Sequence, residues 1–155
     1  SALWDRFLPH FALPGDAPTV LIPDEGKTIA LPSGARVRFI PAHGLHSPGN
    51  FVAYDEKTRI LFSGDLGAAM VPAGEWKLFV EDFTKHTVYM DGFHRRFLAS
   101  TKAIHAFLKR IEGLPIDMIC PQHGSIFRGA DVQRFLAWLA KLEVGFDFRS
   151  WGDAG

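Results

Sequence analysis

Apolar and polar residues alternate along several short segments of the chain, which is the pattern of half-buried β-strands. The clearest alternation runs from Ala35 to Ile40. Two apolar runs, Phe51 to Tyr54 and Arg59 to Phe62, are joined by the turn Asp55-Glu56-Lys57-Thr58 and predict a β-hairpin. The other predicted strands are Thr19 to Ile22 and Ile116 to Cys120.

Apolar residues spaced three or four apart predict helices between and around these strands. An amphipathic helix, or the end of one, is expected from Ser1 to Phe11. A second begins at a capping residue, Ser100 or Thr101, and runs to about Glu112; a third is capped by Asp131. Residues 67–94 predict a loop and a short helix packed over the neighbouring strand ends. Strands followed by strand–helix units indicate α/β or α+β layers.

Composition narrows the class of protein. The 155 residues are 47% hydrophobic and 13% aromatic, which fits one globular domain with a real core. The 17 basic and 17 acidic residues balance, so no nucleic-acid partner is expected. No apolar run has membrane-spanning length and no signal peptide is recognisable, so no membrane partner is expected. The single cysteine, Cys120, excludes an internal disulfide and indicates a cytoplasmic location.

Candidate chemistry lies in three short strings that each place a potential metal ligand at the end of an apolar run. His46 follows Leu45 and precedes Ser47-Pro48-Gly49, Asp65 follows the run Leu61 to Gly64, and His123 stands in Cys120-Pro121-Gln122-His123-Gly124. Strands fix the positions of such residues, and the turns after them let the side chains converge. Imidazole and carboxylate groups are common metal ligands.

Each of these residues has a plainer interpretation when taken alone. His46 could be a surface-loop histidine, Asp65 a helix cap and His123 a histidine that satisfies a turn. The plain interpretations require three unrelated explanations, whereas one metal site accounts for all three residues and their order. The spacing also fits, since Asp65 lies 19 residues after His46 and His123 lies 58 residues after Asp65. Asp65 has two oxygens and could bridge two cations, which lie about 3.5–4 Å apart in such sites.

Three further residues are candidates for supporting roles. His43 precedes His46 by three residues; it is expected to support the site or to pack beside it, and the alternative is a second ligand from the same loop. The run His94-Arg95-Arg96 is either a solvated helix face or a functional cluster beside the substrate. In the functional case, Arg95 would lie near an anionic substrate or partner.

The strings resemble the metallo-β-lactamase fold superfamily, and in detail its di-iron branch, the flavodiiron proteins and related oxygen-binding di-iron proteins. The stretches that carry the resemblance are Trp4 to Phe11, Ala42 to Asn50, Phe62 to Asp65, Gly92 to Phe97 and Pro121 to Gly124. The resemblance implies a four-layered αββα sandwich with a dimetal site at the rim between its sheets. It implies that His46 is a terminal ligand on one metal, that Asp65 bridges, and that His123 is a terminal ligand on the other.

One expected part of the pattern is missing. The superfamily supplies its other ligands from an upstream string of the form His-x-Glu-x-Asp or His-x-His-x-Asp-His, and this sequence contains neither. Residues 1–148 therefore resemble the C-terminal part of such a domain, without the first metal-binding loop, and residues 149–155 are expected to be a loose tail. The chain also contains no flavodoxin-like domain, so it is not expected to carry a flavin.

The resemblance leaves three functions open. The first is part of a domain with two iron ions that binds or reduces oxygen or nitric oxide, with an external electron donor in the case of a reductase. The second is a zinc hydrolase of the same fold, because carboxylate and imidazole ligands suit both metals. The third is a sensing or interaction module without catalysis. An incomplete sandwich is expected to form a homo-oligomer or to bind a complementing N-terminal segment.

Overall fold

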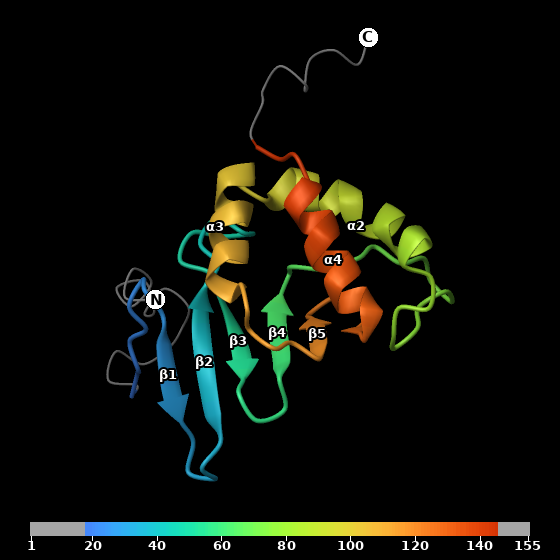
Figure 1. The fold of residues 1–155 in the computed structure, drawn as a ribbon. Coiled ribbons are helices and arrows are strands. Elements are labelled where there is room, and N and C mark those ends of the chain that lie inside the picture. The colour runs from blue at the N-terminus through green and yellow to red at the C-terminus, as the bar shows by residue number, and fades with distance from the viewer. Residues whose placement is uncertain (1–17, 146–155) are drawn as a thin grey trace.

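The computed structural model describes residues 18–145, and their strands form one six-stranded sheet in the order β1-β2-β3-β4-β5-β6 (Figure 1). The strands are β1 (Lys27–Ala30), β2 (Arg36–Pro41), β3 (Phe51–Asp55), β4 (Ile60–Gly64), β5 (Met118–Pro121) and β6 (Phe127–Arg128). Neighbouring strands are antiparallel except β4 and β5, which run parallel. Helices α2 (Phe83–Phe97) and α3 (Thr101–Ile111) lie in the connection between β4 and β5, and α4 (Ala130–Lys141) follows β6.

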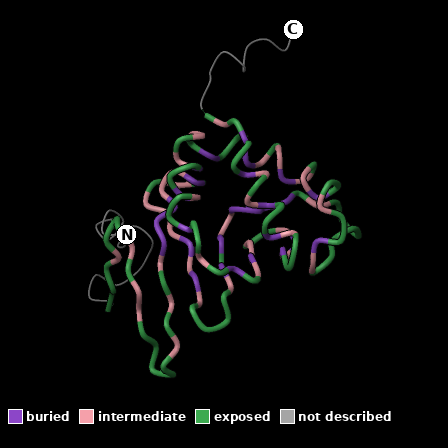
Figure 2. Tube along the Cα trace, viewed as in Figure 1, coloured by how far each residue is buried: buried purple, intermediate pink, exposed green. Residues whose placement is uncertain are grey.

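The core lies between one face of the sheet and the three helices. Alternate residues of the strands point toward the helices and join helical residues in a single cluster. Its strand members are Ile40, Val52, Tyr54, Leu61, Ile119 and Phe127, and its helical members include Met90, Ile104, Phe107, Phe135 and Leu139. Figure 2 shows the buried segments gathered where helices meet strands, whereas β1 and its turn to β2 contain only exposed and half-buried residues. The predicted α/β class is therefore confirmed.

Most predicted strands form where the sequence places them. The hairpin appears as β3 and β4, the alternating segment as β2, and the last apolar run as β5. The strand predicted over Thr19–Ile22 is wrong: this segment pairs with no strand among residues 18–145, and Val20 is 62% exposed. Pro23 ends it, and the hydrogen-bonded partner of β2 is instead Lys27–Ala30. The helix expected over Ser1–Phe11 and the tail 149–155 lie outside the described residues.

The helices agree with the sequence in part. The second helix is confirmed as α3, with the Ser100 side chain accepting a hydrogen bond from the Ala103 N–H at 3.1 Å. Asp131 was expected to cap α4, but the cap position is Gly129 and Asp131 lies in the first turn. The helix after Gly67 has 15 residues, longer than the short helix expected. Its apolar periodicity is hidden because two of its three buried residues are histidines.

The opposite face of the sheet carries an apolar row that crosses four strands. Phe39, Ala53, Phe62 and Cys120 lie side by side in register, and each is at least partly exposed. Phe62 is the most open, with half of its surface exposed. Apolar rows of this kind are usually covered by another protein surface.

This face predicts self-association of the isolated chain. Phe62→Lys should shift the chain toward monomer, because it places a charge in the middle of the apolar row. Light scattering over a wide concentration range measures this. Val88→Lys is the matched control, since Val88 is 73% exposed on α2 and lies outside the row. A parent chain that is already monomeric at every concentration would contradict the prediction.

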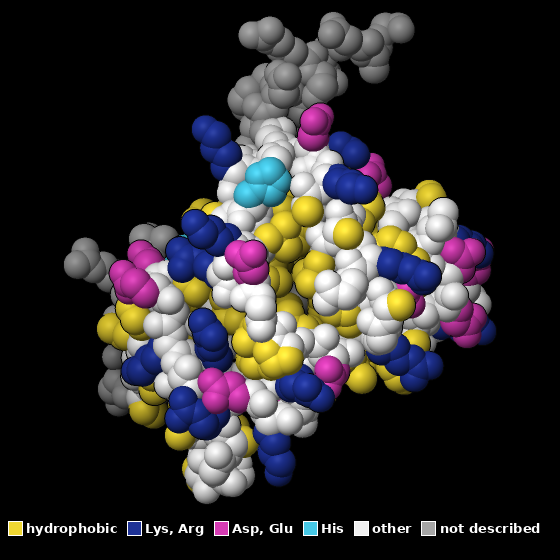
Figure 3. Space-filling model, viewed as in Figure 1, with side chains coloured by type: hydrophobic (Ala, Val, Ile, Leu, Met, Phe, Trp, Pro, Cys, Tyr) yellow, Lys and Arg dark blue, Asp and Glu magenta, His cyan; other side chains and the backbone are white. Residues whose placement is uncertain are grey.

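The surface formed by the helices, unlike the outer face of the sheet, carries many charged side chains. Figure 3 shows basic and acidic side chains scattered over it and a hollow with hydrophobic walls between α3 and α4. This hollow, of about 410 Å³, includes Leu108, Leu114 and Leu136 in its lining. Within residues 18–145, no helix combines the length and the apolar character needed to span a bilayer.

Candidate metal centre

His46 lies in the loop between β2 and β3. The loop closes on itself, because the Ala42 N–H donates to the Asn50 carbonyl at 2.9 Å and the Asn50 amide donates to the Leu45 carbonyl at 2.7 Å. Leu45 is fully buried and anchors the loop. His46 has a φ of 93°, a left-handed conformation that costs a residue other than glycine about 1–3 kcal/mol. The bonds around it therefore hold the His46 backbone in a conformation it would otherwise avoid.

Asp65 is the first residue after β4. The turn that carries it is fixed by the buried Ser63 hydroxyl, which donates to the Leu66 carbonyl at 2.6 Å. The Asp65 side chain is only 18% exposed, and its Oδ1 atom is buried without a hydrogen-bond partner. A buried carboxylate oxygen without a donor is costly, and a bound cation would supply the missing interaction.

His123 lies in the turn after β5, and two backbone hydrogen bonds join this turn to the Asp65 loop. The Gln122 N–H donates to the Gly64 carbonyl at 2.7 Å, and the Ala69 N–H donates to the His123 carbonyl at 3.2 Å. Gly124 has a φ of 111°, and a Cβ atom there would lie 3.0 Å from the Ala69 nitrogen. The glycine therefore allows the close approach of the two loops.

The structure brings the three predicted ligands together. His46 Nε2 lies 3.4 Å from Asp65 Oδ2, and His123 Nε2 lies 3.8 Å from Asp65 Oδ1. The carboxylate thus stands between the two imidazoles, with one oxygen toward each. Two donors bound to one ion at about 2.1 Å with a tetrahedral angle lie about 3.4 Å apart. The closer pair has this spacing, and the wider pair would need a small inward movement.

The three side chains are of types that bind metal ions, but they are too few to complete two metal sites. Imidazole and carboxylate are ligands for iron, zinc and manganese alike. Among residues 18–145, however, no group of three or more His, Cys, Asp or Glu side chains is placed to hold one metal ion. The arrangement is two pairs that share Asp65, which gives two ligands for each of two ions.

Two of the supporting candidates lie in contact with other groups. His43 Nε2 is 3.3 Å from the Asp24 carbonyl, at the start of the chain segment that leads into β1. Arg95 is exposed on α2, pairs with Asp91 at 2.7 Å and donates to the Glu143 carbonyl at 2.9 Å. The Arg95 guanidinium therefore binds protein groups at the helix surface.

His94 is the supporting candidate that contacts the Asp65 loop. It is fully buried, and its Nε2 accepts a hydrogen bond from the Gly67 N–H at 3.0 Å. Its Nδ1 lies 2.8 Å from the Met90 carbonyl and donates to it, which fixes the tautomer. Burial lowers the pKa of His94, so the ring is neutral. The sequence gives no signal for this contact, because Gly67 lies 27 residues earlier.

The two buried histidines of α2 predict a loss of stability in acid. Burial also lowers the pKa of His86, so the unfolded chain takes up these protons at about pH 6.5 and the folded protein only at lower pH. The free energy of unfolding should therefore fall below about pH 6.5, by up to ~1.4 kcal/mol per pH unit for each histidine. Urea unfolding of metal-free protein at pH 7.5 and 5.5 measures this. His86→Phe should show a smaller loss between these pH values, and an equal loss would contradict the prediction.

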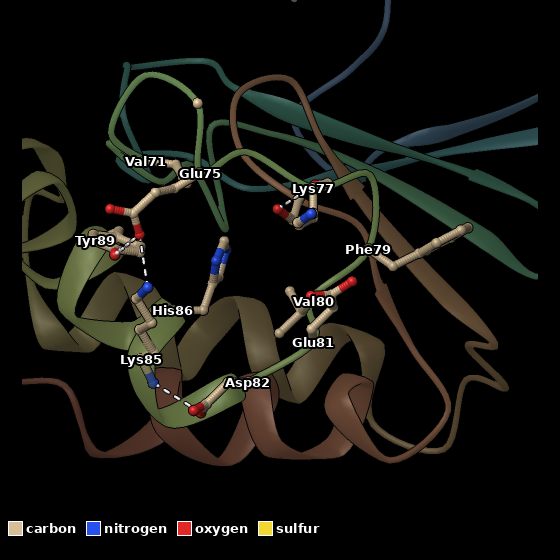
Figure 4. A pocket seen from close by; sticks show the side chains of 12 residues that line it. Val71, Glu75, Lys77, Phe79, Val80, Glu81, Asp82, Lys85, His86 and Tyr89 are labelled. Carbon is tan, nitrogen blue, oxygen red and sulfur yellow. Dashed lines mark hydrogen bonds and ion pairs between the residues drawn. The ribbon is translucent and has the colours of Figure 1, made fainter.

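A cavity of about 310 Å³ is lined mainly by the segment 71–82 and by the first half of α2 (Figure 4). His86 rises from α2 into its lining, and Glu75 binds both Lys85, at 2.7 Å, and Tyr89, at 3.1 Å. The lining does not include His46, Asp65 or His123. The cavity is therefore separate from the candidate metal centre.

Comparison with known proteins identifies the family to which the chain belongs. A family model described as ODP family beta lactamase matches residues 1–124. The rubredoxin-oxygen oxidoreductase of Megalodesulfovibrio gigas is 32% identical over 120 residues, which make up 72% of this chain and 28% of that protein. The chain therefore spans less than a third of the length of this relative.

Solved structures similar to this chain include members of the same family. The apo state of the chemotaxis sensor ODP from T. denticola is 46% identical, with a TM-score of 0.87, and the match covers 97% of this chain and 61% of that one. A structure described as a peroxy diiron species of the chemotaxis sensor ODP is 45% identical, with a TM-score of 0.85, covering 97% and 62%. The flavodiiron protein from Giardia intestinalis is 21% identical, with a TM-score of 0.72, covering 88% and 34%, which shows the fold alone. The predicted metallo-β-lactamase-like fold is confirmed.

Proposed function

This chain belongs to the ODP family of beta lactamases, and on that premise we propose that it is part of a domain that holds two iron ions and binds oxygen. The observation that carries the proposal is the Asp65 carboxylate, which stands between His46 and His123 with an unpartnered buried oxygen. His46 would bind one iron, His123 the other, and Asp65 both. Two irons held in this way would supply an open coordination position for a diatomic molecule.

The residues of this chain would orient and partly neutralise the centre. Asp65 would offset part of the charge of the two ions. The rings of Phe93 and Phe97, stacked beside the His46 imidazole, would limit its motion and so reduce the entropy lost on binding. The two bonds between the Asp65 and His123 loops would keep the two ligand pairs at a fixed separation.

The comparisons support sensing over reduction. The two structures named as a chemotaxis sensor are 46% and 45% identical to this chain, whereas the oxidoreductase relative is 32% identical. We therefore propose that oxygen binding serves as a signal. Reduction of oxygen is the second candidate, supported by the rubredoxin-oxygen oxidoreductase relative, and it would require an external electron donor. Nitric oxide remains a candidate ligand for the same position.

The ligand count predicts weak binding by the chain alone. A protein metal site needs about three protein ligands for each ion, and residues 18–145 offer two for each. We therefore expect substoichiometric iron in the isolated chain and two irons in a polypeptide that also carries the segment preceding it in its parent protein. Metal analysis after dialysis against a chelator measures both. Two irons retained by the isolated chain would show that further ligands lie within it.

The function itself is tested with that longer polypeptide. It is loaded with ferrous iron without air, and its absorption spectrum is recorded while oxygen is admitted. The proposal expects an absorption change that depends on oxygen. Selection of zinc, together with hydrolysis of an ester, thioester or phosphodiester and no response to oxygen, would instead favour a zinc hydrolase.

A further inference from the structure

We propose that His94 is a positioning residue, which fixes the Asp65 loop and joins it to the His46 loop through the last turn of α2. This inference rests on the proposed function, because it concerns the same ligands. It assigns a role to a residue that is fully buried and contacts no solvent.

The first link runs from His94 to the Asp65 loop. The Gly67 N–H, two residues beyond Asp65, donates to His94 Nε2 at 3.0 Å, and the Ala68 N–H donates to the Asp65 carbonyl at 3.0 Å. The His94 ring is held in turn by the Met90 carbonyl and by the edge-on Trp138 ring of α4 at 5.1 Å. His94 therefore holds Gly67 from a position that cannot shift without repacking the core.

The second link runs from the same helical turn to the His46 loop. The rings of Phe93 and Phe97 stack beside the His46 imidazole, at 6.1 and 5.6 Å between centroids. The backbone continues the contact, because the Ala99 N–H donates to the Gly44 carbonyl at 2.8 Å. The end of α2 thus touches both loops.

The third ligand is connected through the Asp65 loop. The Ala69 N–H, two residues after Gly67, donates to the His123 carbonyl at 3.2 Å. Loss of the His94 acceptor would therefore loosen the loop that lies between the other two ligands. A buried N–H left without an acceptor costs about 1–3 kcal/mol, so the loop would be expected to move rather than leave Gly67 unpaired.

The test compares three variants of the complete natural polypeptide that contains this chain. His94→Phe keeps a ring of similar size but offers no acceptor, and His94→Gln restores an acceptor. His86→Phe is the matched control, since His86 is a buried histidine two turns earlier on α2 whose Nε2 has no hydrogen-bond partner. If His94→Phe does not fold, His94→Leu makes the same test with a smaller side chain.

Two measurements are made on each variant. Hydrogen exchange of residues 65–69 in the metal-free protein reads the loop directly, and ferrous iron affinity without air reads the site. His94→Phe should exchange at least about 10-fold faster in this segment and lose about 10–100-fold in iron affinity, the usual effect of losing a group that orients a ligand. His94→Gln should recover most of both, and His86→Phe should change neither.

The outcomes separate the two proposals. Equal exchange and equal affinity in His94→Phe and His86→Phe would overturn the role of His94. Failure of the unchanged protein to bind iron would overturn the proposed function, and the exchange measurement would still decide whether His94 holds the loop.

Discussion

Asp65→Asn is expected to abolish iron binding at the candidate centre. Asparagine keeps the shape of the side chain but loses the negative charge and one of the two oxygens that face His46 and His123. Because Asp65 is the shared member of both ligand pairs, the loss of affinity should exceed the roughly 10–100-fold that follows loss of a supporting residue. The oxygen-dependent absorption change should disappear with it.

The same substitution should leave the stability of the metal-free protein intact. Asp65 Oδ1 accepts no hydrogen bond that asparagine would lose, so the unfolding midpoint should not fall. Asp117→Asn is the control, since Asp117 is an exposed residue that pairs with Arg59 at 2.9 Å, away from the site. If Asp65→Asn still bound two irons, the bridging assignment would be wrong. If Asp65→Asn unfolded the metal-free protein, the main role of Asp65 would be to stabilise the fold.

Phe127→Ala is expected to destabilise the fold by about 3–5 kcal/mol, the usual effect of removing a buried aromatic ring. Phe127 is fully buried on β6, stacks on Phe135 at 4.6 Å and meets the His86 ring at 5.6 Å. It also lies under Gly67, where a Cβ atom would approach the ring to 2.8 Å. Its removal would leave a void beneath the Asp65 loop as well as in the core.

Urea unfolding at a fixed protein concentration measures this loss. Phe62→Ala is the matched control, because Phe62 is half exposed on the outer face of the sheet. It should cost less than about 1 kcal/mol in the isolated chain. Similar losses for the two variants would show that the outer face is packed as tightly as the core.

The three candidate ligands could be predicted because their positions depend on local pattern. Each follows a strand, and strand ends are visible in a run of four or five apolar residues. The strand at Thr19–Ile22 was wrong for the same reason: an apolar run shows what could be buried, not which partner strand is available. β1 exists because it pairs with β2, and nothing local to Lys27–Ala30 shows this.

The extent of α2 and the role of His94 could not be predicted. Histidine is not counted as apolar, so His86 and His94 break the helical pattern although both are buried. The bond from Gly67 to His94 links residues from two elements that only tertiary packing brings together. The local pattern therefore predicts only a short helix here, and it does not show which residue joins this helix to the candidate ligands.

The parallel pairing of β4 with β5 has a consequence for when the centre forms. These two strands are joined by a connection of more than fifty residues that holds α2 and α3. Contacts between residues so far apart in the chain form late and slowly, since a long loop must close first. Asp65 and His123 can meet only after that closure. The pair formed by Asp65 and His123 is therefore completed later in folding than the pair formed by His46 and Asp65, which needs only the nearby β3–β4 hairpin to form.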